Sequence, residues 1–231
     1  LAVPAAIAPT SPLQLPLPKL TLAMPLPAHI QQCHKELSKL PARFHHFDAT
    51  SDIGVPTLYL LQRYEGHPLC STFVSCSTEF DPWTAYEKVM REACVGRTAM
   101  PFYQDFSNDP MRFARLEDGA AFMGQPKQES AFDFLYDSPK QTGIASLTQS
   151  LPADSQAQFQ WLVERFRSLD FELTLVELTP DDLREAGLFV YRAIAPDLMP
   201  LDFLPSSRLL AHPRLYDCPQ SAGFPVNAAA V

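Results

Sequence analysis

The pattern of apolar and polar positions divides the chain into short helices and strands. Apolar residues recur every three or four positions over residues 28–40, which predicts an amphipathic helix. Three strand-like runs follow, over residues 43–50, 57–64 and 69–77. The middle run is apolar throughout its first half, as expected of a strand that is covered on both faces.

The clearest helical pattern starts after residue 80. Asp81 is a good N-cap residue and Pro82 is favoured at the first helical position, so the helix begins there. Its apolar positions recur at helical spacing and its other face carries Arg91 and Glu92. Glu87 and Arg91 have the i,i+4 spacing of an ion pair, so the pattern by itself favours a solvated, salt-bridged face.

The second half of the chain alternates between helix and strand. Residues 98–150 are irregular, with a short helix expected over 130–138. The elements that follow are a helix over 153–168, a strand over 171–179, a short helix ended by Gly187 and a strand over 188–195. The last 35 residues are rich in proline and show no regular pattern. This order predicts a mixed α/β fold, with a mixed β-sheet flanked by helices.

Proline marks the N-terminal segment as different from the rest. Seven of the 23 prolines lie in residues 1–27, and proline favours extended backbone. The leucines of this segment alternate, so we expect it to lie against a surface. We therefore divide the chain into a proline-rich extended segment, 1–27, and a single α/β domain, 28–231, which ends in a C-terminal tail.

Composition excludes several classes of protein. The 231 residues include 26 acids and 18 bases, a net charge of −8, which disfavours sequence-independent nucleic-acid binding. No apolar run approaches 18 residues, so we expect no membrane span. The five cysteines are odd in number, widely spread and without a CxxC motif. We therefore expect a cytoplasmic protein whose cysteines are reduced.

Familiar catalytic and nucleotide-binding motifs are missing from the sequence. It contains no P-loop, GxGxxG, HExxH or GxSxG motif, so a nucleotide would have to be held by side chains and metal. His45 and His46 are adjacent and point to opposite faces of a strand. Together with Cys33 and His34 they form a nominal zinc set, but the spacing fits none of the usual frameworks. Partly buried histidines beside a strand are favoured over a metal site.

Four stretches in order resemble the C-terminal half of the YcaO-domain family. They are FDATSDIGVPTLYLL (47–61), FDPWTAYEKVMREACVGR (80–97), FARLEDGAAFMGQPKQESAFDFLYDS (113–138) and REAGLFVYRAIAPDLMPLDF (184–203). The resemblance implies an ATP-dependent cyclodehydratase with ATP and Mg²⁺ as cofactors. A Cys, Ser or Thr side chain of a ribosomal precursor peptide attacks the preceding amide carbonyl. ATP then phosphorylates the oxyanion, and loss of phosphate leaves a thiazoline or oxazoline. A related thioamide-forming activity is also compatible with the resemblance.

The resemblance also implies roles for individual residues, although it assigns no catalytic residue. The helix motif implies ATP binding by Arg91, Glu92 and Arg97, with Glu92 as a metal ligand. The residues implied to lie near the active site are Thr50, Asp52, Glu117 and Asp118, and those implied for an active-site tail are Phe224 and Pro225.

Two hypotheses about function remain open. The first is an enzyme or part of one, because the glutamate-rich ATP motifs of the family mostly precede the matched region. The second is a non-catalytic scaffold or partner subunit that keeps the fold without a complete ATP site. We expect a leader-peptide-binding partner protein, a complementary YcaO half, or both. The sequence shows no exposed edge strand suited to binding a peptide by strand addition.

Overall fold

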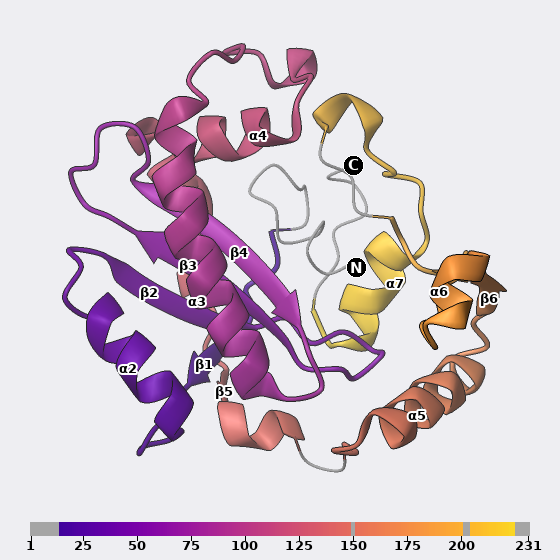
Figure 1. The fold of residues 1–231 in the computed structure, drawn as a ribbon. Helices are drawn as coiled ribbons and strands as arrows, with labels where there is room; N and C mark the ends of the chain where they lie inside the picture. The colour runs from indigo at the N-terminus through magenta and orange to yellow at the C-terminus, as the bar shows by residue number, and fades with distance from the viewer. Residues whose placement is uncertain (1–13, 149–150, 201–203, 225–231) are drawn as a thin grey trace.

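A five-stranded mixed sheet is the largest element of the computed structural model, which describes residues 14–148, 151–200 and 204–224 (Figure 1). The strand order is β4-β3-β2-β1-β5, and β6 and β7 form a separate two-stranded sheet. The strands are β1 (Lys19–Thr21), β2 (Arg43–Asp48), β3 (Thr57–Arg63), β4 (Thr72–Thr78), β5 (Gln141–Gly143), β6 (Thr174–Glu177) and β7 (Tyr191–Ile194). The α-helices are α2 (Ala28–Leu37), α3 (Pro82–Ala99), α4 (Leu116–Met123), α5 (Ser155–Ser168), α6 (Asp181–Glu185) and α7 (Arg214–Ser221).

The sheet combines a local meander with one long-range pairing. β2, β3 and β4 pair antiparallel in chain order, and the central strand β3 is buried from Thr57 to Gln62. β1 pairs antiparallel with β2 on one side and parallel with β5 on the other. The expected mixed sheet and the doubly covered middle strand are both confirmed.

Helices α2 and α3 cover one face of the sheet (Figure 1). Leu58 and Leu60 of β3 point toward Tyr86 and Val89 of α3. Ser75 of β4 donates its hydroxyl to the backbone oxygen of Val89 at 2.9 Å. The predicted helix over 28–40 is confirmed as α2, one turn shorter than expected.

The opposite face is covered by segments that are far apart in the sequence. Leu15 and Leu17 of the proline-rich segment pack there with Phe132 of a 3-10 helix (Pro126–Tyr136) and Leu215 of α7. The described part of the N-terminal segment therefore lies against the sheet, as the alternating leucines predicted. Residues 1–13 of that segment lie outside the described residues.

The sheet formed by β6 and β7 lies apart from the five-stranded sheet. Figure 1 shows β6 at the rim of the molecule, beside α5 and α6. Every residue of both strands is exposed, and each strand has an unpaired outer edge within the described residues. The expectation of no exposed edge strand is therefore wrong.

Several other elements differ from the sequence predictions. α4 and α7 lie in stretches read as irregular, and β1 and β5 are strands of only three residues that show no periodicity. The short helix expected over 130–138 is part of the 3-10 helix noted above. In the part of the chain that the structure describes, no helix is both long and apolar enough to cross a bilayer.

Candidate functional site

Helix α3 presents the residues that the sequence motif marked for nucleotide binding. Asp81 caps the helix by accepting from the backbone N–H groups of Trp83 and Thr84, at 3.3 and 3.0 Å. Pro82 occupies the first turn, where its missing N–H costs nothing. This cap and the buried apolar face fix the rotation of the helix, so its remaining side turns outward.

The outer side of α3 carries Arg91 and Glu92, both exposed. Partial desolvation raises the pKa of Glu92 above its ordinary value. The expected ion pair between Glu87 and Arg91 does not form. Among the described residues, α3 forms an ion pair between Lys88 and Glu79, and Arg91 forms none, so its charge is available to a ligand.

Arg97 lies elsewhere on the helix and has defined partners. Positions five apart lie about 140° apart around an α-helix, so Arg97 and Glu92 do not share one face. The Arg97 guanidinium lies 5.2 Å from the ring centre of Tyr64. With its amide oriented to satisfy both neighbours, buried Gln62 accepts from Arg97 Nε at 3.1 Å and donates to the backbone oxygen of Ala93 at 3.2 Å. Tyr64 and Gln62 thus orient Arg97 while most of its five N–H donors stay unused by these contacts.

Gly96 allows α3 to approach the sheet closely. A Cβ atom at this position would lie 2.0 Å from Cζ of Phe73 on β4, inside any possible contact distance. The lack of a side chain at Gly96 therefore allows the end of α3 that carries Arg97 to lie close to β4 and to Gln62 of β3.

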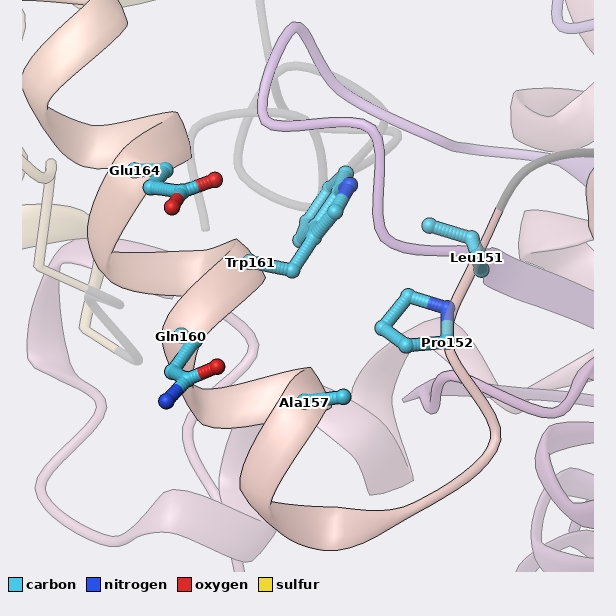
Figure 2. Close-up of a pocket in the computed structure, with 6 residues that line it drawn as sticks. All are labelled: Leu151, Pro152, Ala157, Gln160, Trp161 and Glu164. Atoms are coloured by element: carbon cyan, nitrogen blue, oxygen red, sulfur yellow. The ribbon is translucent and has the colours of Figure 1, made fainter.

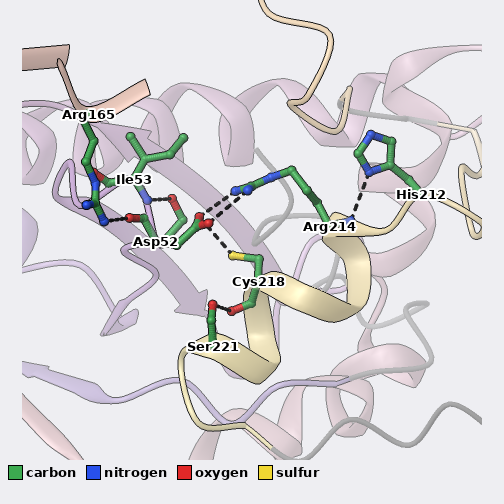
Figure 3. Close-up of polar contacts among 8 residues, drawn as sticks. Asp52, Ile53, Arg165, His212, Arg214, Cys218 and Ser221 are labelled. Atoms are coloured by element: carbon green, nitrogen blue, oxygen red, sulfur yellow. Dashed lines mark hydrogen bonds and ion pairs between the residues drawn. The ribbon is translucent and has the colours of Figure 1, made fainter. Parts of the chain in front are cut away.

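A second polar cluster surrounds Asp52, in the loop between β2 and β3 (Figure 3). Arg214 of α7 donates to both carboxylate oxygens of Asp52, at 3.0 and 2.6 Å, and Cys218 Sγ lies 3.5 Å from Oδ1. Arg165 of α5 donates to the backbone oxygens of Asp52 and of Ile53. The loop is therefore clamped between α5 and α7.

Burial and charge act in opposite directions within this cluster. Burial would raise the pKa of Asp52, but the hydrogen bonds and positive charge of Arg214 outweigh it and hold the pKa below its ordinary value. Burial raises the pKa of Cys218, so its thiol stays protonated. Arg214 is itself buried, with its guanidinium 4.8 Å from the ring centre of Phe171. Its Nε has no hydrogen-bond partner among the described atoms.

The neighbouring residue Thr50 is part of the same loop. Its backbone N–H donates to Asp48 Oδ1 at 3.0 Å, and its hydroxyl accepts from the backbone N–H of Thr57 at 3.1 Å. Gly54 takes a φ of +86°, which favours glycine, and lies beside Trp161. These local bonds give the loop a fixed shape from β2 to β3.

Glu117 and Asp118 lie at the start of α4, a helix whose Ala121 packs with Met100, the residue that follows α3. Asp118 is buried, and its carboxylate accepts from the backbone N–H groups of Ala114 and Arg115 and from Arg115 Nε. These backbone hydrogen bonds lower the pKa of Asp118. Glu117 is half-buried and stands next to this capping arrangement. A role of either residue near an active site stays a prediction.

The tail residue Phe224 packs on the core cluster beneath the sheet. Its ring lies 5.7 Å from Lys140 Nζ, and its backbone N–H donates to the backbone oxygen of Pro219 at 3.0 Å. Pro225 lies outside the described residues.

The two adjacent histidines point to opposite faces of β2, as predicted. His46 stacks on Tyr86 with ring centres 4.9 Å apart, and His45 meets the edge of Tyr136 at 5.1 Å. Burial lowers the pKa of His46 to about 3, with smaller contributions from His34 and His45. Both imidazoles are thus packed against aromatic rings. Within the described ranges, no three His, Cys, Asp or Glu side chains gather closely enough to hold a metal ion.

A hollow of about 470 Å³ lies beside α5, and Figure 2 shows its lining. Trp161 extends from the helix toward Leu151 and Pro152, while Gln160 and Glu164 lie along the helix. None of the residues marked by the sequence motifs lines it. Apolar and polar side chains share its open wall, and it carries no cluster of reactive groups.

The structure thus places the marked residues in separate regions instead of one pocket. Arg91 and Glu92 share the outer side of α3, Arg97 lies on its flank, and Asp52 belongs to the clamped loop. The residues that sequence reasoning missed are the partners of Asp52, namely Arg165, Arg214 and Cys218. Arg214 is 162 positions from Asp52, and no local pattern connects the two.

Comparison with known protein families gives one match that covers most of the chain. The model of the YcaO cyclodehydratase family, described as ATP- and Mg²⁺-binding, matches residues 5–199. That range includes α3, the Asp52 loop and most of the proline-rich segment. A search of curated proteins found no significant match.

Solved structures with a similar fold include two heterocyclases. One, in complex with substrate and cofactor, is 16% identical with a TM-score of 0.67 and matches 99% of this chain and 29% of its own. The heterocyclase TruD is 17% identical with a TM-score of 0.62. The alignment covers 98% of this chain and 30% of TruD. The YcaO protein of Methanopyrus kandleri, bound with AMPPCP and Mg²⁺, is 15% identical with a TM-score of 0.54. The alignment covers 78% of this chain and 45% of the Methanopyrus protein. The chain thus spans less than half the length of each of these structures.

Proposed function

Because the chain belongs to the YcaO family, we propose that it supplies part of an ATP-dependent cyclodehydratase that acts on a ribosomal precursor peptide. The observation that carries the proposal is the family match over residues 5–199, which is supported by a heterocyclase-like fold over almost the whole chain. The product would be a thiazoline from Cys, or an oxazoline from Ser or Thr. ATP converts the amide oxygen into a phosphate leaving group, so the ring can form with loss of that oxygen.

The residues on α3 fit the phosphates of a nucleotide better than they fit Mg²⁺. Arg91 is exposed, and Arg97 is oriented by Tyr64 and Gln62 with N–H donors to spare. Glu92 supplies one carboxylate, whereas Mg²⁺ prefers an octahedral set of oxygen ligands. Within the described residues no set of three ligands gathers, so the remaining ligands would come from phosphate, water or polypeptide outside the described part.

We therefore propose that the ATP site is assembled between α3 and a completing polypeptide. By this term we mean the YcaO-family sequence of the same organism that supplies the rest of the domain, either in a longer form of this chain or as a separate chain. The peptide substrate and a leader-binding partner belong to this assembled state. Its expected compartment is the cytoplasm, which agrees with the finding that all five cysteines are free.

ATP hydrolysis tests the proposal. The 231-residue chain alone should show no ATP turnover above background, and addition of the completing polypeptide and precursor peptide should produce it. Glu92→Gln should lower the rate of the assembled enzyme about 10- to 100-fold, because it removes the charge expected beside Mg²⁺. Phosphate release at saturating ATP is the measurement.

The control is Glu87→Gln, the same chemical change on the same helix at a position the family motif does not mark. It should leave the rate within about threefold of the unmodified enzyme, a change of at most about 0.7 kcal/mol in the barrier. If the fully assembled protein binds the precursor but never turns over ATP, the scaffold hypothesis replaces the enzyme. Sustained turnover by the chain alone would contradict the proposed division of the site.

A further inference from the structure

A glutamine interrupts the apolar row that β3 turns toward α3. Alternate residues of a strand share a face, so Leu58, Leu60 and Gln62 all point toward the helix. Gln62 is only 1% exposed, and its cross-strand neighbours are Phe44 on β2 and Phe73 on β4. A buried amide among apolar side chains destabilises a fold unless its hydrogen bonds are made, whereas an apolar residue at this position would have no such requirement.

Both hydrogen bonds of Gln62 are made to α3, and one of them holds Arg97. The amide donates to the backbone oxygen of Ala93 and accepts from Arg97 Nε. In an α-helix the oxygen of residue 93 also accepts from the backbone N–H of residue 97, so it has a partner without Gln62. The group on α3 that depends on the amide is therefore the Arg97 guanidinium.

Tyr64 fixes the plane of the same guanidinium. The ring of Tyr64 lies beneath it, and this ring meets the ring of His67 edge-on, with centres 5.2 Å apart. His67 is in turn held in the β3–β4 loop, because its Nδ1 accepts from the backbone N–H of Cys70 at 2.9 Å. Arg97 is thus held at Nε by one residue and on its face by another.

The outer edge of the guanidinium is unpaired. Among the described residues no ion pair includes Arg97, and its two terminal nitrogens, Nη1 and Nη2, have no hydrogen-bond partner. These two nitrogens carry four of the five N–H donors of an arginine. Because Nε is occupied, an anion can form two parallel hydrogen bonds only at the Nη1–Nη2 edge. Such a geometry suits two oxygens of a single phosphate group.

We propose that Gln62 and Tyr64 are positioning residues, which hold Arg97 so that Nη1 and Nη2 together bind two oxygens of one phosphate group. The identification of this group as a phosphate of ATP rests on the proposed function, whereas the positioning rests on the contacts of Gln62 and Tyr64. Lysine could not replace Arg97, because an ammonium group has no Nε for Gln62 to hold and no planar pair of nitrogens.

Nuclear magnetic resonance of the isotope-labelled full chain tests the edge that is used. The Arg97 side-chain signals are assigned by their loss in Arg97→Lys. Addition of ATP should shift the Arg97 Nη signals, while the Nε–H stays hydrogen-bonded. Sodium chloride at the same ionic strength is the control for general screening of charge. The proposal is overturned if ATP shifts no Arg97 signal, or if sodium chloride shifts these signals equally.

A matched pair of glutamine substitutions tests the positioning. Gln62→Met keeps the volume but removes the amide, and it should raise the Kd for ATP about fivefold, the effect of about one hydrogen bond. Gln158→Met makes the same change on α5, where Gln158 Nε2 donates to the backbone oxygen of Pro152, and should change Kd less than about twofold. A purely structural role of Gln62 predicts a lower unfolding temperature with an unchanged Kd, and that result would overturn the proposal.

Substitutions of Tyr64 give an independent test that does not require a change in the core. Tyr64 is half-buried at the end of β3. Tyr64→Leu removes the ring and should raise the Kd for ATP about threefold, as expected for the loss of a cation–π contact. Tyr64→Phe keeps the ring and should recover the affinity of the unmodified chain. Equal affinities of Tyr64→Leu and Tyr64→Phe would refute the role of the ring.

Binding and turnover separate this inference from the proposed function. If ATP shifts the Arg97 signals and Gln62→Met weakens binding, but the assembled protein never hydrolyses ATP, the enzyme is disproved and the positioning stands. If the assembled protein hydrolyses ATP while the Arg97 signals of the chain do not respond to ATP, the positioning is disproved and the enzyme stands.

Discussion

The ion pair between Asp52 and Arg214 joins two segments that are 162 positions apart in the sequence. Both side chains are largely removed from water, with 21% and 9% of their surface exposed. A buried ion pair stabilises a folded protein little more than an apolar pair of similar volume. Removal of one partner, however, leaves the other charge buried and unpaired. Cys218 and Arg165 contact the same residue, so the loss of either charged group affects the loop, α5 and α7 together.

Arg214→Met should destabilise the protein substantially. Methionine fills similar volume but leaves the Asp52 carboxylate without its cation, at a cost of up to about 3–5 kcal/mol. Urea unfolding measures the change in the free energy of unfolding. The control Arg167→Met removes an exposed arginine of α5 and should stay within about 0.5 kcal/mol. Equal unfolding midpoints for the two variants would contradict the structural role of the pair.

The contribution of this pair should also depend on pH. The folded-state pKa of Asp52 lies below its ordinary value of 3.8, so the stabilisation is complete above the unfolded-state pKa and is lost as pH falls through the folded-state pKa. The gap in unfolding free energy between the unmodified protein and Arg214→Met should therefore be constant above about pH 5 and shrink below pH 4. Urea titrations at several pH values measure this difference in unfolding free energy. A difference that grows as the pH falls would contradict the prediction.

At the scale of elements, α3 approaches β4 closely where Gly96 faces the ring of Phe73. Glycine inside a helix normally costs about 1 kcal/mol relative to alanine, so Gly96→Ala would stabilise an isolated helix. Here the added methyl would meet the Phe73 ring, so we expect a net loss of about 1–3 kcal/mol in unfolding free energy.

The double variant Gly96→Ala with Phe73→Ala isolates the cause of that loss. Without the ring, the alanine at position 96 should be neutral or favourable relative to Phe73→Ala alone. Thermal unfolding of the four proteins gives the coupling between the two positions. A Gly96→Ala variant that is more stable than the unmodified chain would show that the ring moves aside freely.

Local patterns predicted the elements whose side chains alternate between core and solvent. α2, α3, α5 and the three meander strands follow helical or strand periodicity and were located within a few residues. β1 and β5 were missed because three residues are too few to show a period, and α7 because Pro219 and a short length obscure it. Strand formation by residues 174–177 was predictable, but its separation from the main sheet depends on tertiary packing.

The candidate site was predictable only where one element carries it. Arg91, Glu92 and Arg97 could be marked because one helix motif contains all three. The angular separation of Glu92 from Arg97, and the contacts of Arg97 with Gln62 and Tyr64, needed coordinates. The same is true of the clamp on Asp52, whose partners come from two helices distant in sequence.

Across the whole molecule, stability should be distributed unevenly. β3 is buried on both faces and paired on both edges, whereas β6 and β7 are exposed throughout. Amide exchange of the isolated chain should therefore be slowest in β3 and fastest in the β6–β7 sheet. Mass spectrometry of deuterated peptides measures this order, and similar protection in both sheets would contradict it.

The parallel pairing of β1 with β5 has a consequence for the order of folding on the ribosome. Lys19 pairs with Gln141, so the strand that completes the sheet is made long after the one it joins. At about 5–20 residues per second, β1 waits roughly 6–24 seconds for β5 to be synthesised. The meander of β2, β3 and β4 needs only neighbouring residues and can form within that interval. During the wait one edge of β1 stays open to other nascent chains, and its length of three residues limits how much it can pair with them.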